Sequence, residues 1–199
     1  MFRSGPSILA LTIALAGAAA SPPVDPLEII HSGSYAATVS PSPSARILNW
    51  NIDRGRHFKG IVAAMRETHP DLCIFQEVDL GARRTHGEDV AQELAKTFGM
   101  NYTFAPEFRE LGQSTAEGPA YHGQAILTNA DPRFAHLAVH SSIGLLEAAP
   151  IGGRRIRTHI IIGALDWIFV RGPITCEGAE VHSDFHASDH FPISAELHF

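Results

Sequence analysis

The sequence predicts an α/β domain, a layered sandwich of mixed β-sheets flanked by helices. Several short apolar stretches alternate with a period of two, as strands do, and two longer stretches repeat their apolar residues at helical spacing. The order is strand, helix, strand, helix and then mainly strands, which is typical of layered α/β domains. With 199 residues, of which 45% are hydrophobic, the chain fits a single domain.

The folded region begins with a strand and a helix. Residues 46–52 (RILNWNI) predict a strand whose polar Asn49 and Asn51 share one face, because side chains two residues apart point the same way. Residues 57–68 predict an amphipathic helix that Pro70 terminates. Its apolar face carries residues spaced at i, i+3, i+4 and i+7, namely Phe58, Ile61, Val62 and Met65.

A second strand and a second helix follow. Residues 71–79 (DLCIFQEVD) predict a short buried strand that runs directly into acidic residues. Residues 88–98 predict a helix in which Val90, Leu94 and Phe98 are four residues apart, with Gly99 as its stop.

The remainder of the chain predicts mainly strands. The stretch 141–157 is rich in glycine and carries little signal. The last two strands are joined by a polar loop. The expected strands cover residues 101–106, 123–129, 133–140, 166–172 and 191–199.

The N-terminal region differs in composition from the domain. Residues 1–20 combine an arginine at position 3, a short apolar core and a run of alanines, the pattern of a secretory signal peptide. Residues 21–44 are rich in proline and serine and predict a flexible leader. The folded domain is therefore expected over residues 45–199, in a protein that is secreted or periplasmic.

The net charge limits the ligands that the protein can bind, and the cysteine content limits its disulfides. The net charge of −6 predicts no strong general affinity for nucleic acid or anionic lipid, so a phosphate must be bound locally, by a metal or a few arginines. Export permits disulfides, yet Cys73 and Cys176 are the only cysteines. Because Cys73 lies inside an apolar strand, we expect a buried free thiol there.

Polar groups occur at four strand ends, where α/β folds build their sites. Acidic and amide oxygens on converging strand ends suit Mg²⁺, which leaves its other positions to water and a substrate phosphate. A lone acid in an apolar run costs several kcal/mol to bury unless it is paired, so we expect Asp166 to pair with His190. The residues concerned are Asn51, Asp53, Glu77, Asp166, Asp189 and His190.

In this order, five motifs resemble those of the endonuclease/exonuclease/phosphatase family of metal-dependent phosphate-ester hydrolases. The opening ILNWNIDRG and the following PDLCIFQEVD are similar to the first two family motifs. YHGQAILTN is similar to a family strand that usually reads Gly-Asn-Ala-Ile-Leu. LDWIFVRG and ASDHFPISAEL are similar to the closing pair.

The resemblance implies the family's fold and a role for each site residue. It implies that Asn51 is the active-site asparagine and that Asp166 orients a catalytic His190. Glu77 and Asp189 are implied as ligands of Mg²⁺ or Mn²⁺, and Asn51 and the nearby Asp53 are added as candidate ligands. The implied substrate is a phosphate ester of a nucleic acid, a lipid or a small molecule.

The sequence departs from the family between about residues 130 and 163. There the family has a central strand ending in a histidine, and a later strand with Gly-Asp-Phe-Asn, whose aspartate is assigned as general acid or base. This chain has no such motif, and its segment is short, so the resemblance implies an internally truncated domain. The pair Thr158-His159 fits either the central histidine or a loop entering the next strand.

Three functions stay open. The first is an exported, Mg²⁺-dependent phosphodiesterase-type hydrolase, impaired to the extent that the missing motif is needed. The second is a non-catalytic remnant that binds metal or phosphate. The third is a zinc site, because His182, His186 and His190 would share one face of a helix. Arg83-Arg84 fits either a phosphate contact or a solvated loop. The sequence sets no oligomeric state.

Overall fold

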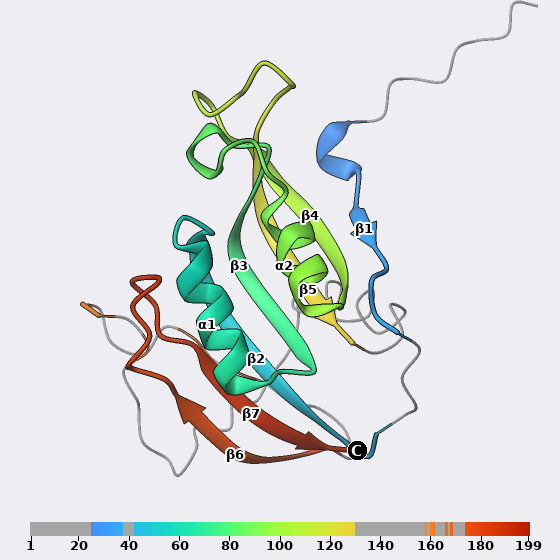
Figure 1. Ribbon diagram of the computed structural model, residues 1–199, viewed down its shortest axis with the longest axis vertical. Coiled ribbons are helices and arrows are strands. Elements are labelled where there is room, and N and C mark those ends of the chain that lie inside the picture. The colour runs from blue at the N-terminus through green and yellow to red at the C-terminus, as the bar shows by residue number, and fades with distance from the viewer. Residues whose placement is uncertain are drawn as a thin grey trace, which may run out of the picture.

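The computed structural model describes residues 25–37, 42–129, 158, 160–161, 166, 168 and 174–199. These residues form a seven-stranded sheet with two α-helices, as shown in Figure 1. The elements in chain order are η1 (Pro26–Glu28), β1 (His31–Gly33), β2 (Ser44–Arg54), α1 (Phe58–Thr68), β3 (Leu72–Leu80), η2 (Arg83–Thr85), α2 (Val90–Phe98), β4 (Asn101–Arg109), β5 (Tyr121–Thr128), β6 (Thr175–Val181) and β7 (Ile193–His198).

The sheet is mixed, as the sequence predicts. Its strands lie side by side in the order β1-β4-β5-β3-β2-β7-β6. The central strands β2 and β3 are parallel and are connected through α1, whereas every other neighbouring pair in this sheet is antiparallel. The carboxyl ends of β2 and β3 therefore meet at one edge of the sheet, and that edge carries the predicted site.

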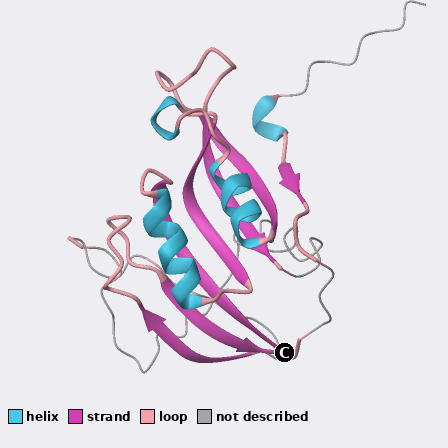
Figure 2. Ribbon diagram, in the orientation of Figure 1, coloured by secondary structure: helices cyan, strands magenta, loops and turns pink. Residues whose placement is uncertain are grey.

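Both helices cover the same face of the sheet (Figure 2). Alternate residues of the central strands point to this face and pack against the apolar sides of α1 and α2. Full burial of each large side chain contributes about 1.5–3 kcal/mol. The core includes Leu48, Trp50, Ile61, Met65, Phe75, Val90, Leu94 and Phe104.

The helix ends follow the sequence signals. The chain leaves α1 through His69 in a left-handed conformation, directly before Pro70. Asp89 caps α2 by accepting a hydrogen bond from the Gln92 N–H, and left-handed Gly99 ends the helix. No helix in the described part of the chain is long and apolar enough to cross a membrane.

A bulge in β3 changes which of its side chains point away from the core. Phe75 and Val78 both face the helices although two residues separate them, and the register with β5 shifts between them. The side chains of Gln76 and Glu77 hydrogen-bond Asn49 and Asn51, respectively, which share one face of β2. The bulge thus directs two consecutive polar side chains to the face opposite the helices.

Two segments differ from the sequence-based expectation. The leader contributes β1, which pairs with β4, although its three residues are too few to show a period. The polar loop before the last strand contains β6, an edge strand without a buried face that carries a glycine and two glutamates. The predicted signal peptide and the strand at 133–140 lie outside the described residues. So does most of the strand at 166–172.

Candidate active site

The first part of the site joins the ends of β2 and β3. Asn51 lies opposite Gln76 in the parallel pairing. The Asn51 Nδ2 donates a hydrogen bond of 3.1 Å to Glu77 Oε1, and the Asn51 Oδ1 accepts one of 3.2 Å from the Asp53 N–H. The Asn51 amide thus holds both the Glu77 carboxylate of β3 and the backbone of Asp53 at the end of β2.

The backbone at these positions is unusual. Glu77, Asp53 and Arg54 have φ values of 51°, 41° and 66°, in the left-handed region that non-glycine residues seldom adopt. Left-handed non-glycine residues cost energy and are concentrated at functional sites. The strain here coincides with the bulge that aims Glu77 at Asn51.

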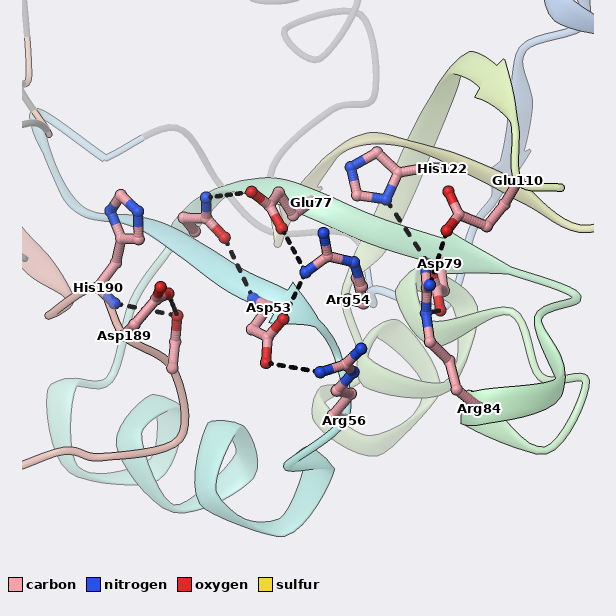
Figure 3. Close-up of polar contacts among 12 residues, drawn as sticks. Asp53, Arg54, Arg56, Glu77, Asp79, Arg84, Glu110, His122, Asp189 and His190 are labelled. Carbon is pink, nitrogen blue, oxygen red and sulfur yellow. Dashed lines mark hydrogen bonds and ion pairs between the residues drawn. The ribbon is translucent and has the colours of Figure 1, made fainter. Parts of the chain in front are cut away.

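Two arginines accompany the acidic side chains. The Arg54 Nη1 lies 2.6 Å from Asp53 Oδ1 and 2.9 Å from Glu77 Oε2, so one guanidinium bridges two carboxylates. The Arg56 Nη1 lies 3.7 Å from Asp53 Oδ2. In Figure 3, Arg54 lies between Glu77 and Asp53, and Arg56 approaches Asp53 from the other side.

The second part of the site is a histidine–aspartate pair. The His190 Nδ1 lies 2.8 Å from Asp166 Oδ2, and the two side chains are 14% and 9% exposed. The pairing accounts for the acid in the apolar run, since a partnered carboxylate can be buried at much lower cost. The roles assigned to both residues stay predictions.

The backbone around this pair is held by hydrogen bonds to Thr158 and Trp50. The buried Thr158 Oγ1 accepts a hydrogen bond of 3.0 Å from the Asp166 N–H. The Thr158 carbonyl accepts one of 2.6 Å from the Phe191 N–H. The Trp50 Nε1 donates one of 2.8 Å to the His190 carbonyl. Thr158 thus connects Asp166 to Phe191, and His159, the candidate central histidine, lies outside the described residues.

Asp189 is exposed and lies beside His190 (Figure 3). Its Oδ1 accepts a hydrogen bond of 3.3 Å from the Ser188 hydroxyl, and its carbonyl accepts one from the Ile160 N–H. Among the described residues, no three Asp, Glu, His or Cys side chains gather closely enough to hold a metal ion by themselves. The predicted ligands Glu77, Asp53 and Asp189 therefore do not form a ready-made carboxylate cluster.

The donors nevertheless suit a hard divalent cation. Mg²⁺ is usually bound through one or two carboxylates, and water and substrate phosphate oxygens complete its coordination. Glu77 provides one carboxylate, and the Asn51 side-chain oxygen lies within the same hydrogen-bonded unit. The Arg54 guanidinium between Glu77 and Asp53 shows that this position attracts a cation.

A buried ionic network continues from the site along β3. Asp79 is fully buried, and Arg84 donates two hydrogen bonds of 2.7 Å to its carboxylate. The Arg84 Nη1 also lies 2.7 Å from Glu110 Oε1, and the His122 Nδ1 lies 3.7 Å from Asp79 Oδ1. Burial opposes ionisation of Asp79, but His122 and Arg84 outweigh it and lower the pKa of this carboxyl. Arg84 is thus an internal counterion, which neither alternative from the sequence describes.

A cleft of about 600 Å³ lies next to the turn that carries Asp53, with Gly55 and Arg56 in its lining. It lies between the start of α1, η2 and the loop before β7, and Arg56 connects it to Asp53. Its lining does not include Glu77 or His190, so the candidate site lies beside this cleft. Its lining includes three exposed basic side chains: Lys59 of α1, His86 directly after η2, and His186 of the loop before β7.

The structure contradicts the zinc alternative. The three histidines do not share a helix face, because residues 182–190 form turns and bends. The His182 Nε2 is 2.7 Å from the Ser194 hydroxyl, the His186 ring lies edge-on to Phe191, and His190 pairs with Asp166.

Comparison with known proteins identifies the fold. No family model matches the sequence, and no curated protein matches it either. A solved structure described as an endonuclease/exonuclease/phosphatase from Beutenbergia cavernae superimposes with a TM-score of 0.52 and 10% identity, over 79% of this chain and 72% of that chain. A humanised Danio rerio TDP2 carrying 14 mutations gives a TM-score of 0.47 and 12% identity, over 79% of this chain and 100% of the other. The first likeness confirms an endonuclease/exonuclease/phosphatase-like fold.

Proposed function

We propose that this chain hydrolyses a phosphate ester, with a divalent cation at Glu77 and with His190 acting on the phosphate. The observation that carries the proposal is the contact of 2.8 Å between His190 and Asp166. The His190 carbonyl accepts a hydrogen bond from the indole of Trp50, the neighbour of Asn51 on β2, so this pair lies near the strand ends that bear Asn51 and Glu77. The fold is consistent with this chemistry, because the solved structure that shares it is described as an endonuclease/exonuclease/phosphatase.

The histidine–aspartate pair suits a reaction in which negative charge grows on phosphate oxygens. When water attacks phosphorus, an oxygen–phosphorus bond forms as the bond to the leaving group breaks. One proton of the attacking water passes to bulk water, and negative charge develops on the non-bridging and leaving oxygens. Asp166 holds the Nδ1 proton of His190, which makes Nε2 the nitrogen that would meet a phosphoryl oxygen. A protonated imidazole donates its hydrogen bond to that oxygen, and Asp166 stabilises the positive ring.

The cation would be held by Glu77 and Asn51, with Asp189 as the further predicted ligand. A divalent cation there would supply Lewis-acid stabilisation of charge on a phosphoryl oxygen. All the candidate donors are hard oxygens, which suit Mg²⁺ and Mn²⁺ alike. Glu77 is held for this task by the hydrogen bond from Asn51 and by its left-handed backbone.

The proposed substrate is a phosphate ester. A net charge of −6 disfavours a long nucleic-acid strand and favours a smaller or lipid-borne phosphate. We propose that hydrolysis takes place outside the cytoplasm, on the basis of the signal-peptide pattern in residues 1–20.

The test is hydrolysis of bis(p-nitrophenyl) phosphate with Mg²⁺, with Mn²⁺ and with chelator. The key variant is His190→Ala, for which we expect a rate lower by about 1,000-fold. His186→Ala is the matched control, because His186 is exposed in the same loop and lies outside the pair with Asp166. All proteins must first show the same cooperative melt.

Two results would contradict the proposal. A His190→Ala variant with the wild-type rate would assign the hydrolysis to another group. A folded wild-type protein that turns over no phosphodiester with either metal would favour the non-catalytic, metal- or phosphate-binding remnant.

A further inference from the structure

The two carboxylates at the centre of the site have all four of their oxygens occupied by the chain itself. The Glu77 Oε1 accepts a hydrogen bond from the Asn51 amide, and Glu77 Oε2 lies 2.9 Å from the Arg54 Nη1. The Asp53 Oδ1 lies 2.6 Å from the same Arg54 nitrogen, and Asp53 Oδ2 faces Arg56 at 3.7 Å. Two negative side chains are thus balanced by two positive ones.

Arg54 is the residue that links these acids. Its Nη1 lies between carboxylates from two different strands, 2.6 Å from Asp53 Oδ1 and 2.9 Å from Glu77 Oε2. A cation bound to Glu77 Oε2 would lie within a few ångströms of the guanidinium on the same oxygen, and the two positive charges would repel each other. Metal binding to this oxygen and the Arg54–Glu77 contact therefore oppose each other.

We propose that Arg54 is an internal counterion that a divalent cation must displace from Glu77, and that the displaced guanidinium then binds the substrate phosphate. The second half rests on the proposed function. Among the described residues the Arg56 side chain pairs with Asp53, at 3.7 Å, and not with Glu77, so we expect it to stay in place when the metal enters. Arg54 would be a positioning and substrate-binding residue that couples cation binding to phosphate binding.

The local structure permits this exchange. The side chain of Arg54 is 32% exposed, and those of Asp53 and Glu77 are 23% and 34% exposed. The guanidinium is thus not enclosed by packing, and its contacts are of the partly solvated kind that break at modest cost. The turn formed by left-handed Asp53, Arg54 and Gly55 keeps the base of the side chain beside the acids while its end moves.

The charge balance explains why a phosphate would follow the metal. Without a divalent cation, the four side chains sum to zero charge, and a phosphate gains little there. A divalent cation raises the local charge by two units, and the released guanidinium can form paired hydrogen bonds with a phosphate. Phosphate binding should therefore be stronger when Mg²⁺ is present, and Mg²⁺ binding stronger when phosphate is present.

The test is calorimetric titration of the full chain with Mg²⁺, for wild type, Arg54→Gln and Arg56→Gln. We expect Arg54→Gln to bind Mg²⁺ about three- to tenfold more tightly than wild type, because no counterion has to be displaced. Arg56→Gln removes the same charge close by but does not free Glu77, so its affinity should change less than about twofold. The three melts without metal establish that the variants are folded.

The second arm uses inorganic phosphate as the probe, with and without Mg²⁺. We expect Mg²⁺ to strengthen phosphate binding to wild type and to Arg56→Gln, and this gain to be lost in Arg54→Gln. An Arg54→Gln variant with unchanged Mg²⁺ affinity, or an equal gain in Arg56→Gln, would overturn the counterion role. An intact phosphate gain in Arg54→Gln would overturn the phosphate role.

These outcomes are separable from failure of the proposed function. If Arg54→Gln binds Mg²⁺ more tightly and no phosphodiester is hydrolysed, the counterion role holds and the hydrolase proposal fails. If hydrolysis requires Mg²⁺ and His190 but Arg54→Gln binds Mg²⁺ like wild type, the hydrolase proposal holds and the role of Arg54 is wrong.

Discussion

Removing the buried carboxylate of Asp79 should destabilise the protein strongly. The Asp79 side chain is fully buried, and its partner Arg84 is only 15% exposed. Breaking a buried ion pair by deleting one partner costs about 3–5 kcal/mol, since the other charge is left uncompensated. Arg84 keeps its contact with Glu110, which is 21% exposed, so we place Asp79→Asn at the lower end, about 3 kcal/mol. For a domain of this size that loss lowers Tm by about 6–12 °C.

The same prediction has a pH dependence of defined sign. The pKa of Asp79 is lowered on folding, because His122 and Arg84 outweigh the effect of burial. Its carboxylate therefore contributes stability that is present above the unfolded pKa of about 3.9 and is lost as the pH falls through the folded value. The difference between wild type and Asp79→Asn should be largest near neutral pH and shrink below about pH 4.

Urea denaturation from about pH 7 to pH 3 measures the free energy of unfolding of wild type and Asp79→Asn. The difference between the two proteins gives the loss of stability and its pH dependence. Glu110→Gln is the matched control, because it removes a more exposed carboxylate from the same arginine and should cost about 1 kcal/mol or less. A loss below about 1 kcal/mol for Asp79→Asn at pH 7 would refute the reasoning, as would a difference between wild type and variant that does not change with pH.

Three further predictions concern the dyad, the cysteines and one glycine. Asp166→Asn should lower kcat for a phosphodiester about 100-fold and change KM little, because His190 keeps its place but loses the carboxylate that stabilises its charge; an unchanged kcat would remove Asp166 from the mechanism. Burial, together with the charge of Asp71, raises the pKa of the Cys73 thiol far above its usual range, so Ellman's reagent should label Cys176 in the folded protein and both cysteines only after unfolding. Rapid labelling of native Cys73 would contradict its burial. A Cβ on Gly123 would lie 2.1 Å from the Ala105 carbonyl oxygen, so Gly123→Ala should lose more than about 3 kcal/mol in urea denaturation, and a near-neutral effect would show that β4 and β5 can separate there.

The central elements of the fold could be predicted from the sequence because one face of each is buried. The period of two in β2 and the helical spacing in α1 both come from contact with the same core. The edge strands β1 and β6 have no such signal. β6 has exposed or partly exposed side chains throughout, and β1 has only three residues. Their pairing depends on backbone hydrogen bonds to a neighbour, which leave no mark on residue type.

The site could be predicted in part. The pairing of Asp166 with His190 was expected from the cost of a lone buried acid and from the family resemblance, and the structure places them 2.8 Å apart. The bridge made by Arg54 could not be predicted, since it depends on a left-handed turn and on a bulge that brings Glu77 to the same face. Thr158 acts through its backbone and hydroxyl contacts, and the sequence around it gave no sign of them.

The most direct test of the central claim compares phosphodiester hydrolysis by wild type and Glu77→Ala across a Mg²⁺ titration, with a chelated sample as the zero point. We expect turnover that requires Mg²⁺ and is lost in Glu77→Ala, while both proteins melt cooperatively. Turnover that survives either chelation or the loss of Glu77 would contradict it. So would a folded wild type that hydrolyses nothing at any Mg²⁺ concentration, which would leave a shared fold without the chemistry.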